Sequence, residues 1–587
     1  MNDYPELFSD AVESDIYPNA RTCELCVHGL RTPERKRSPW DSTPWLSQMT
    51  LSLNISVWRQ HETTSFSPSN PRTSLSLLVA SFFIIDFVLF LSWLLIIYPY
   101  FYSPFRHLPR PKQQGEIPII GQFTHPHTKP LGSTYLKWLT SVSNEGLITY
   151  RSILNQDRIL LTSPKAIAEV LVSNTYAYTK HPNDISVIQR FLGNGLTISE
   201  GAEHRFQRKV ITPIYAVRNI RAFYEVFWKK GVHLVKGLEG ALLTGGCEVE
   251  INQWANRATM DIIGLSALGK DFGCLDGAKS ELFETYQEIF TWAPEKDFFM
   301  ALNRILPTGF VQWVPWKVNE RIDATSATLR EICRGLVRER IDQVGKSDGK
   351  GEDLIARMIG MGGWEVEELV EQLLTIIAAG HETSASAFTW TCYLLSQNQP
   401  VQDRLRSELK DIIPALFAAQ DPSSDSLATT LENLPYLNAV CNEVLRFRPP
   451  VPLLRRIAII PTTILGHAIP PGTQILLCPY AINRSPELWG PDAGEFKPER
   501  WINPETGKAN NDGGMRSNYA NLTFSHGARS CIGLKFAKAE LRTLVAVFVA
   551  RFRFQLARPD LEAVPVGIVS VRPRDGLALR VARVDGS

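Results

Sequence analysis

One cysteine-centred stretch constrains this chain more than any other feature of its sequence. In Phe524-Ser-His-Gly-Ala-Arg-Ser-Cys-Ile-Gly533, Cys531 lies between two glycines, with Arg529 shortly before it. Gly527 and Gly533 carry no Cβ, so they allow a tight turn and a close approach of the backbone to a bound group. A lone cysteine in a glycine-containing loop is usually a buried structural residue. The alternative is a thiolate metal ligand, which must be kept dry and hydrogen-bonded by backbone N–H groups.

The decapeptide resembles the cysteine-ligand loop of the cytochrome P-450 family, the haem-thiolate monooxygenases. The resemblance implies that Cys531 binds the iron of haem b (iron protoporphyrin IX), with Gly527 and Gly533 letting the loop approach the porphyrin. Arg529 is expected to meet a haem propionate, as arginine meets carboxylates generally. Phe524 is expected to pack on the thiolate side and exclude water.

Length and composition set broad limits on this chain. Its 587 residues exceed an ordinary single core, so we expect one large domain with appendages. A hydrophobic content of 44% with 21% charged residues is typical of a folded globular protein. A net charge of +2 gives no electrostatic argument for a nucleic-acid partner. Nine cysteines without framework spacing indicate reduced thiols in a body that faces the cytosol.

The N-terminal region, residues 1–72, is polar and rich in Ser, Thr, Pro and Asn, which predicts a disordered extension. Its Cys23-Glu-Leu-Cys26 motif is a lone pair, without the second pair that a zinc site needs or the βαβ context of a redox motif. We therefore assign no function to this extension.

An apolar stretch follows, from Leu75 to Tyr98, with Asp86 as its only charge. At about 1.5 Å per residue it is long enough to cross a hydrocarbon core of about 30 Å, so a single transmembrane helix is predicted over residues 73–98. A buried core helix is the alternative. Slightly more Lys and Arg residues follow the span than precede it, which favours a cytosolic C-terminal body.

Five prolines between Pro99 and Pro118 predict a stiff hinge over residues 99–118. This segment resembles the hinge by which microsomal members of the family orient the catalytic domain, here residues 119–587, on the membrane. The resemblance implies a single-pass protein of the endoplasmic reticulum membrane in contact with lipid, its catalytic domain facing the cytosol.

Two basic segments resemble propionate-binding elements of the family. Gly201 to Pro213 predicts a helix stopped near the proline, with His204 and Arg208 one turn apart on one face. A solvated basic face is the plain interpretation. The resemblance to the family's C helix instead places both residues at a propionate. Further along, Arg456 matches a strand arginine with the same role, and aligns better than the preceding arginine.

A long amphipathic helix is predicted to begin near Glu365, because apolar residues recur at helical spacing from Val366 to Ile377. It runs into Ala378-Ala-Gly-His-Glu-Thr-Ser384, although a glycine within a helix costs roughly 1 kcal/mol. This stretch resembles the oxygen-binding groove of the family's I helix. The resemblance makes Glu382 a proton relay and Thr383 the residue that holds dioxygen and a water. Ala379 and Gly380 are expected to leave room for the oxygen.

A third group is expected to fold the haem pocket rather than do chemistry. Leu434-Pro435 begins a predicted helix that ends before Pro449, and Glu443 and Arg446 lie on one face of it. Such a pair alone is worth only about 0.2–0.5 kcal/mol. With Arg500 in the later Phe-Lys-Pro-Glu-Arg-Trp motif, the pair resembles the family's Glu–Arg–Arg cluster.

Taken together, the resemblance implies a mainly α (α+β) fold: a helical haem-binding domain with small β-sheets, preceded by one transmembrane helix. The implied reaction inserts one atom of O2 into an apolar small-molecule substrate, of the kind that fungal microsomal members tailor as lipids or secondary metabolites. Electrons are expected from NADPH through a separate reductase, with a cytochrome b-type protein as a further candidate donor.

Two other functions remain open at this level. The first is a haem-thiolate peroxygenase, isomerase or dehydratase, and the second is a non-catalytic haem-binding membrane protein. The Glu382–Thr383 pair argues against both, because only a monooxygenase needs controlled protonation of dioxygen.

Overall fold

The computed structural model of the protein describes residues 71–111, 119–122, 130–291, 293–306, 308–346, 351–418, 422–560, 562–567 and 569–584. Residues 1–70 of the predicted extension, including Cys23 and Cys26, lie outside this set, as do residues 112–118 of the predicted hinge. The chain divides into two compact units, Met1–Phe82 and Phe83–Ser587.

The described end of the first unit is helical, within α1 (Pro71–Ser92), which is followed by the π-helix η2 (Trp93–Tyr102). The stretch Leu78–Tyr102 has a mean hydropathy of 2.5 and the length to cross a membrane. Its large apolar side chains, such as Phe83, are mostly exposed, as expected for a helix that faces lipid rather than a protein core. The prediction of one apolar helix ahead of the haem-binding domain is therefore confirmed.

This helix continues through Pro99 to Tyr102, beyond the predicted end at Tyr98. Pro99 has no N–H to donate to the preceding turn. The side-chain amide of Asn155 donates instead to the carbonyl of Leu95 at 2.6 Å, and Arg151 donates to the carbonyl of Pro99 at 3.0 Å. These two side chains satisfy backbone groups around the proline, which explains how a helix can pass through a predicted hinge.

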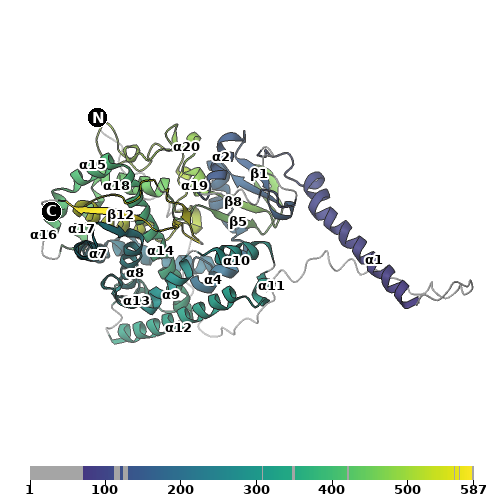
Figure 1. Cartoon of the computed structure of the whole chain (residues 1–587), viewed down its shortest axis with the longest axis horizontal. Helices are drawn as coiled ribbons and strands as arrows, with labels where there is room; N and C mark the ends of the chain where they lie inside the picture. The colour runs from purple at the N-terminus through teal and green to yellow at the C-terminus, as the bar shows by residue number, and fades with distance from the viewer. Residues whose placement is uncertain are drawn as a thin grey trace, which may run out of the picture. The chain divides into compact units, whose positions relative to one another are not determined.

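The second unit is mostly helical, as predicted, and its helices surround α14 (Figure 1). From Ser384 to Ser396 every residue of α14 is buried, because helices pack on all of its sides. The longer helices are α2 (Ser133–Ser141), α4 (Pro182–Leu192), α5 (Gly201–Ile211), α7 (Tyr224–Gly245), α8 (Ile251–Leu268), α9 (Glu281–Phe290), α10 (Pro294–Ile305), α12 (Lys317–Lys346), α13 (Leu354–Met361), α14 (Val366–Gln397), α15 (Gln399–Leu409), α17 (Ser424–Glu432), α18 (Pro435–Phe447) and α21 (Leu534–Arg551). Shorter segments are α3 (Pro164–Ala168), α6 (Val217–Arg221), α11 (Thr308–Trp313), α16 (Ile412–Ala418), α19 (Pro479–Ile482), α20 (Pro486–Trp489), η9 (Pro498–Trp501) and η11 (Gly527–Arg529).

Local sequence signals account for the helices that carry the predicted site. Glu365 caps α14 through a reciprocal capping box with Glu368, so the helix begins where its apolar period begins. Pro435 occupies the first turn of α18, where its missing N–H costs nothing. The predicted basic helix is α5, and Pro213 lies in the 3-10 turn that follows it.

The strands form small sheets, also as predicted. The largest has the order β1-β2-β8-β5-β3, in which β2 and β8 are parallel and the other pairs are antiparallel. Figure 1 shows this sheet beside α2 and α19, and β12 near α17. The sheets are β1 (Leu147–Arg151), β2 (Asp157–Leu161), β8 (Gln474–Leu477), β5 (Leu454–Ala458) and β3 (Tyr178–Thr179); β4 (Glu248–Glu250), β12 (Ala578–Arg583) and β9 (Phe552–Leu556); β10 (Pro565–Val566) and β11 (Arg572–Pro573); β6 (Thr462–Ile464) and β7 (His467–Ile469).

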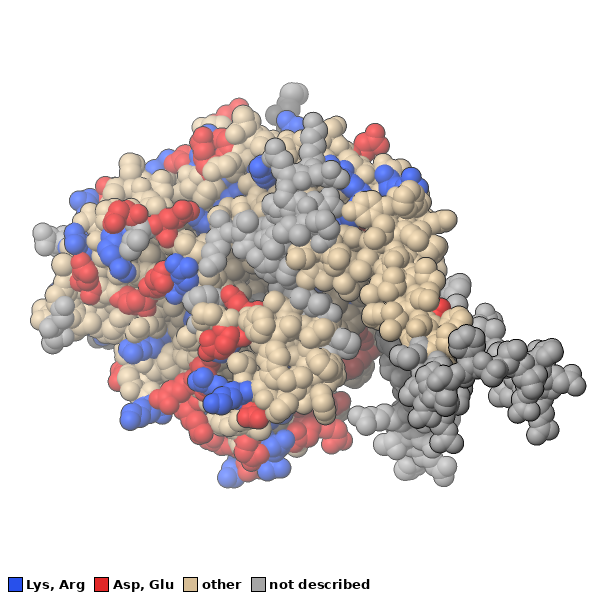
Figure 2. Space-filling model, turned by 45° about the vertical axis from the view of Figure 1, so that its right-hand side comes forward, with Lys and Arg blue, Asp and Glu red and all other residues tan. Residues whose placement is uncertain are grey.

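Two hydrophobic cores hold this unit together. One lies among the helices and includes Phe388, Trp390 and Phe548, and the other lies between the five-stranded sheet and α2 and includes Trp138 and Tyr150. Charged side chains of both signs are interspersed over much of the surface in Figure 2, whereas the tan area on the right, below the blue groups at the upper edge, carries few of them. The small net charge therefore reflects mixing of signs on this face rather than separate charged patches.

Candidate active site

The cysteine loop is built by η11 and the turn that leads into α21. Gly527 has a φ of +71°, and a Cβ at this position would lie 2.0 Å from the carbonyl oxygen of Leu171, so glycine is required. The N–H of Cys531 donates to the carbonyl of Phe524 at 2.8 Å, which closes the loop. Burial raises the pKa of the Cys531 thiol, while the N–H of Gly533 and the charge of Arg208 lower it. The loop thus gives the Cys531 sulfur an N–H donor and a nearby cation and leaves it accessible from the cavity that it lines, as a thiolate ligand needs.

Cys531 lines a cavity of about 440 Å³ that the middle of α14 also lines. The cavity brings together residues that are far apart in sequence. Of the predicted haem-site and oxygen-site residues, Ala379, Gly380, Glu382, Thr383, His204, Arg208, Arg456, Phe524, Arg529, Cys531 and Gly533 line it, whereas Gly527 shapes the turn beside it.

Basic side chains line one part of this cavity. Arg208 donates to the carbonyl and the hydroxyl of Ser530 at 2.6 and 3.2 Å, which ties α5 to the cysteine loop. Burial, Arg529 and Lys180 together lower the pKa of His204 to about 4, so this imidazole is neutral at pH 7. Burial likewise lowers the pKa of Arg456 to about 10.

Arg529 forms an ion pair with Glu200 and donates to the carbonyl of Ser199 at 3.3 Å. Its Nε is buried and has no hydrogen-bond partner among the described residues. Lys180 also pairs with Glu200, at 2.8 Å, and burial lowers the pKa of Lys180 to about 8. One carboxylate thus faces several cations, and this imbalance favours an anionic ligand.

The middle of α14 contributes an acid and an alcohol to this cavity. Burial raises the pKa of Glu382 to about 7, although Arg572 and Ser570 lie close enough to oppose part of the shift. Its Oε2 has no hydrogen-bond partner within the described chain. The Thr383 hydroxyl donates to the carbonyl of Ala379 at 2.7 Å, so its lone pairs are free to accept a hydrogen bond. The pair can therefore hold a proton and position a polar ligand.

Gly380 also faces this cavity, but its missing Cβ has a second consequence. A Cβ there would lie 2.7 Å from Cδ1 of Ile263, so the glycine lets α8 pack closely on α14. This packing is an additional physical reason for the glycine, beside the predicted room for oxygen.

The predicted structural cluster is assembled at the junction of α18 and η9. Arg446 is fully buried and donates to both carboxylate oxygens of Glu443, at 2.7 and 2.8 Å. Its remaining N–H groups donate to the carbonyls of Asn483, Ala493 and Glu495. Arg500 donates to Glu443 at 3.0 Å. All donors of the Arg446 guanidinium are therefore satisfied.

Sequence reasoning missed several residues at this site. Lys180 and Glu200 flank the basic cluster, and Ser570 and Arg572 lie beside Glu382. None of the four lies in a motif with a characteristic spacing, so no local signal could have identified them. Arg572 comes to the site from the short strand β11 and the other three from connections, and their positions depend on the whole fold.

A family model described as Cytochrome P450 matches residues 111–575 of the chain, and this range contains the whole site. The chain belongs to the cytochrome P450 family. It is 37% identical over 508 residues to the cytochrome P450 monooxygenase sphH of Aspergillus fumigatus, covering 84% of this chain and 91% of that protein. It is 36% identical over 513 residues to the monooxygenase ptmK of Penicillium ochrochloron, covering 86% and 99%. Accordingly, this cytochrome P450 is an oxidoreductase that acts on paired donors with incorporation of O2.

The residues of this cytochrome P450 fit the haem that its family uses. Cys531 is accessible and lines the same cavity as the small residue Ala379, so its sulfur is open to a bound group. Arg529 has an orphaned buried Nε in the same cavity, as expected for a site that receives an anionic group. Cys531 would hold the iron, and Arg208, Arg456, Arg529 and neutral His204 would hold the propionates.

Proposed function

We propose that this cytochrome P450 inserts one atom of O2 into an apolar organic substrate, with electrons from NADPH through a separate membrane-bound reductase. The observation that carries the proposal is that Glu382, Thr383 and Cys531 line one cavity. The bound haem supplies the redox chemistry with O2, and the protein supplies binding, proton delivery and exclusion of water.

Glu382 is suited to proton delivery because its pKa of about 7 keeps a large protonated fraction near neutral pH. The Thr383 hydroxyl lies one residue further along α14 and can accept a hydrogen bond from a water or a protonated group. Apolar side chains from several elements, including Ile211, Phe290 and Val451, line the rest of the cavity and restrict water. This environment favours an apolar substrate.

The apolar helix Leu78–Tyr102 supports a membrane location for this enzyme. We assign it to the endoplasmic reticulum membrane as a single-pass protein with its catalytic domain in the cytosol. A reductase and a cytochrome b-type donor would then reach it from the same side. The substrates that we propose are lipids or secondary metabolites, which partition into membranes.

The first test is a carbon monoxide difference spectrum of the reduced full-length protein. A strongly red-shifted Soret band is expected in the wild type and should be lost in Cys531→Ala, because thiolate ligation causes the shift. Cys247→Ala is the matched control, since Cys247 is an exposed cysteine that does not line the cavity. An unshifted band in folded wild-type protein would contradict the proposal.

The second test measures oxidation itself. Purified protein, an NADPH-dependent cytochrome P450 reductase and O2 are combined with a panel of apolar compounds, and NADPH consumption and product mass are followed. Incorporation of one atom of labelled oxygen is expected. Product formed equally well from peroxide without reductase would favour a peroxygenase, and product without added oxygen would favour an isomerase or dehydratase.

A further inference from the structure

A second cavity, of about 480 Å³, lies beside the five-stranded sheet. Strand register shows which of the polar side chains beside it share one face of the sheet. Tyr150 on β1 pairs with Arg158 on β2, and Arg158 pairs with Gln474 on β8, so these three lie in one row on one face. Arg455 on β5 pairs with Leu476, two positions along β8 from Gln474, and therefore shares that face. The sheet thus directs two arginines toward one cavity.

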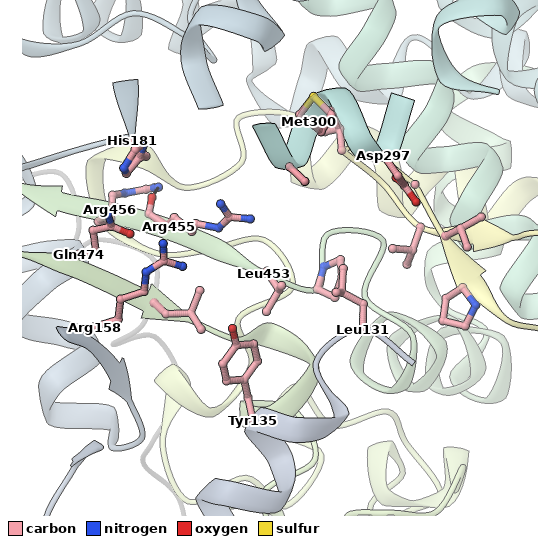
Figure 3. A pocket seen from close by; sticks show the side chains of 18 of the residues that line it. Leu131, Tyr135, Arg158, His181, Asp297, Met300, Leu453, Arg455, Arg456 and Gln474 are labelled. Carbon is pink, nitrogen blue, oxygen red and sulfur yellow. Dashed lines mark hydrogen bonds between the residues drawn. The ribbon is translucent and has the colours of Figure 1, made fainter. Parts of the chain in front are cut away.

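Cationic groups gather at one end of this cavity. Figure 3 shows Arg158, Arg455 and Arg456 close together there with His181, whereas Asp297 lies toward the other end beside Met300. The rest of the lining is largely apolar, with Leu131, Pro452, Leu453, Ile475, Pro565 and Val566 among its members.

The arginines at this cavity differ in their hydrogen-bond and ion-pair partners. Arg455 pairs with Asp184 at 3.2 Å, and Arg456 donates to the carbonyl of Arg455 at 2.8 Å. The Nε of Arg158 is buried without a hydrogen-bond partner, and no carboxylate in the described part of the chain pairs with its guanidinium. Arg158 is therefore the guanidinium at this site that is open to an external anion.

A hydroxyl group adds a neutral donor next to this charge. Tyr135 lines the cavity and lies within 3.4 Å of the Tyr150 hydroxyl. Burial raises the pKa of Tyr135 well above its ordinary value, although Arg455 and Arg158 lower it in part. Tyr135 therefore keeps its proton and can donate a hydrogen bond to an anion held by Arg158.

The second cavity adjoins the first. Arg456 and Val569 line both, and neighbouring residues of the same segment alternate between them: Leu453 and Arg455 face the second cavity, while Leu454 faces the one that contains Cys531. A ligand with an anionic end and a long apolar body could therefore extend from Arg158 toward Ala379 and Thr383 in that cavity.

We propose that the second cavity binds the carboxylate of an amphipathic carboxylic acid substrate, with Arg158 as its principal partner and Tyr135 as a second donor. This proposal rests on the proposed function and narrows its substrate class. A guanidinium pairs with a carboxylate through two parallel hydrogen bonds. A carboxylate that loses its hydrating water on binding needs such a partner. The apolar lining accommodates the attached chain.

The test compares head groups on one chain length, using the detergent-solubilised holoprotein. Dodecanoate, methyl dodecanoate and dodecyl phosphate are titrated, and binding is measured by equilibrium dialysis and by the Soret difference spectrum. Dodecanoate is expected to bind about tenfold or more tightly than its ester, because one charge-assisted pair is formed only with the acid.

Substitution of the arginine assigns the effect to this cavity. Arg158→Leu is expected to weaken dodecanoate binding by about 10- to 100-fold and to leave the ester unchanged. Arg158→Lys keeps the charge but loses the two-pronged geometry, so an intermediate affinity is expected. Arg516→Leu is the matched control, because Arg516 is exposed and lines neither cavity.

Three results would overturn the proposal: equal affinities for acid and ester in the wild type, an acid preference that survives in Arg158→Leu, or tighter binding of dodecyl phosphate than of dodecanoate. The ester comparison needs no variant, so it remains informative if Arg158→Leu does not fold. The carbon monoxide spectrum separates the two proposals. A Cys531-dependent red-shifted band without acid preference removes the carboxylate site and leaves the monooxygenase function standing.

Discussion

Two buried carboxylates on neighbouring helices of this cytochrome P450 have opposite surroundings. Glu443 on α18 is fully buried and accepts hydrogen bonds from Arg446, Arg500, the backbone N–H of Lys497 and the indole of Trp501. Glu382 on α14 is 4% exposed, and its Oε2 has no hydrogen-bond partner among the described residues. The protein therefore surrounds one carboxylate with donors and leaves the other poorly satisfied.

The difference shows how burial can serve two purposes. A carboxylate with several fixed donors, two of them guanidinium groups, fixes the segments that carry those donors. A carboxylate in an apolar cavity has its proton held more tightly, and the pKa of Glu382 rises to about 7. The first arrangement ties α18 to η9 and to the segment before it, and the second suits exchange of a proton at the cavity wall.

The largest expected effect comes from removing a hydrogen-bond partner of Glu443. Arg446→Leu should lower the free energy of unfolding by about 3–5 kcal/mol, because removing one partner of a buried ion pair leaves the other charge under-compensated. It would also leave the carbonyls of Asn483 and Ala493 without their donor. Guanidinium-induced unfolding of the solubilised protein, followed by far-UV circular dichroism, measures the change.

The control for this variant is an exposed ion pair. Arg404 pairs with Glu499 at 2.8 Å, and both side chains are about half exposed. Arg404→Leu should cost about 1 kcal/mol or less, because solvent screens the pair. Equal losses in the two variants would show that the Glu443 cluster has no special structural role.

The second prediction concerns Glu382, the carboxylate with few hydrogen-bond partners. Glu382→Gln removes the titratable proton and keeps the shape, so turnover should fall by about 100-fold while the fold and the carbon monoxide spectrum are retained. Turnover by the wild type should decline as pH rises through about 7, because the protonated fraction of Glu382 falls there. Product formed per NADPH consumed, measured across pH for both proteins, provides the readout. A wild-type pH profile that the variant reproduces would exclude Glu382 as the relay.

The same substitution has a consequence for stability. The folded state holds the Glu382 proton to higher pH than the unfolded state does. The contribution of this proton to the free energy of unfolding is therefore full below about pH 4.5 and is lost as pH rises through about 7. Glu382→Gln lacks this loss and should gain stability relative to the wild type over that interval. Taking the difference between the two proteins removes the titration of other groups, including Glu540, whose pKa is raised to about 8 by burial.

Much of the fold and of the proposed site follows from local pattern. The start of α14 near Glu365 follows from its capping residue and its apolar period, and the start of α18 follows from Pro435. Cys531, Thr383 and Arg208 occur in short motifs, and the structure places all three at one cavity. The roles proposed for them remain predictions.

The remainder depends on contacts between distant segments. The neighbour of Gly380 is Ile263, which lies on another helix, and the row from Tyr150 to Gln474 spans three strands whose register the sequence alone does not specify. The helix through Pro99 likewise relies on Asn155, a residue far along the chain. Local propensity could not have predicted these features, because each is decided by tertiary packing.

The smallest expected effect concerns Gly380, which could be needed for helix packing or for space in the cavity. Gly380→Ala gains up to about 1 kcal/mol of helix propensity but places a methyl group against Ile263, which costs about 1–3 kcal/mol, so a net loss of about 0–2 kcal/mol is expected. Ile263→Val removes Cδ1, the atom that would lie 2.7 Å from the new Cβ, so the double variant should recover most of the stability. If turnover recovers with stability, Gly380 acts by packing α8 on α14. If stability recovers and turnover does not, the glycine is needed for space in the cavity, as its position beside Glu382 predicts.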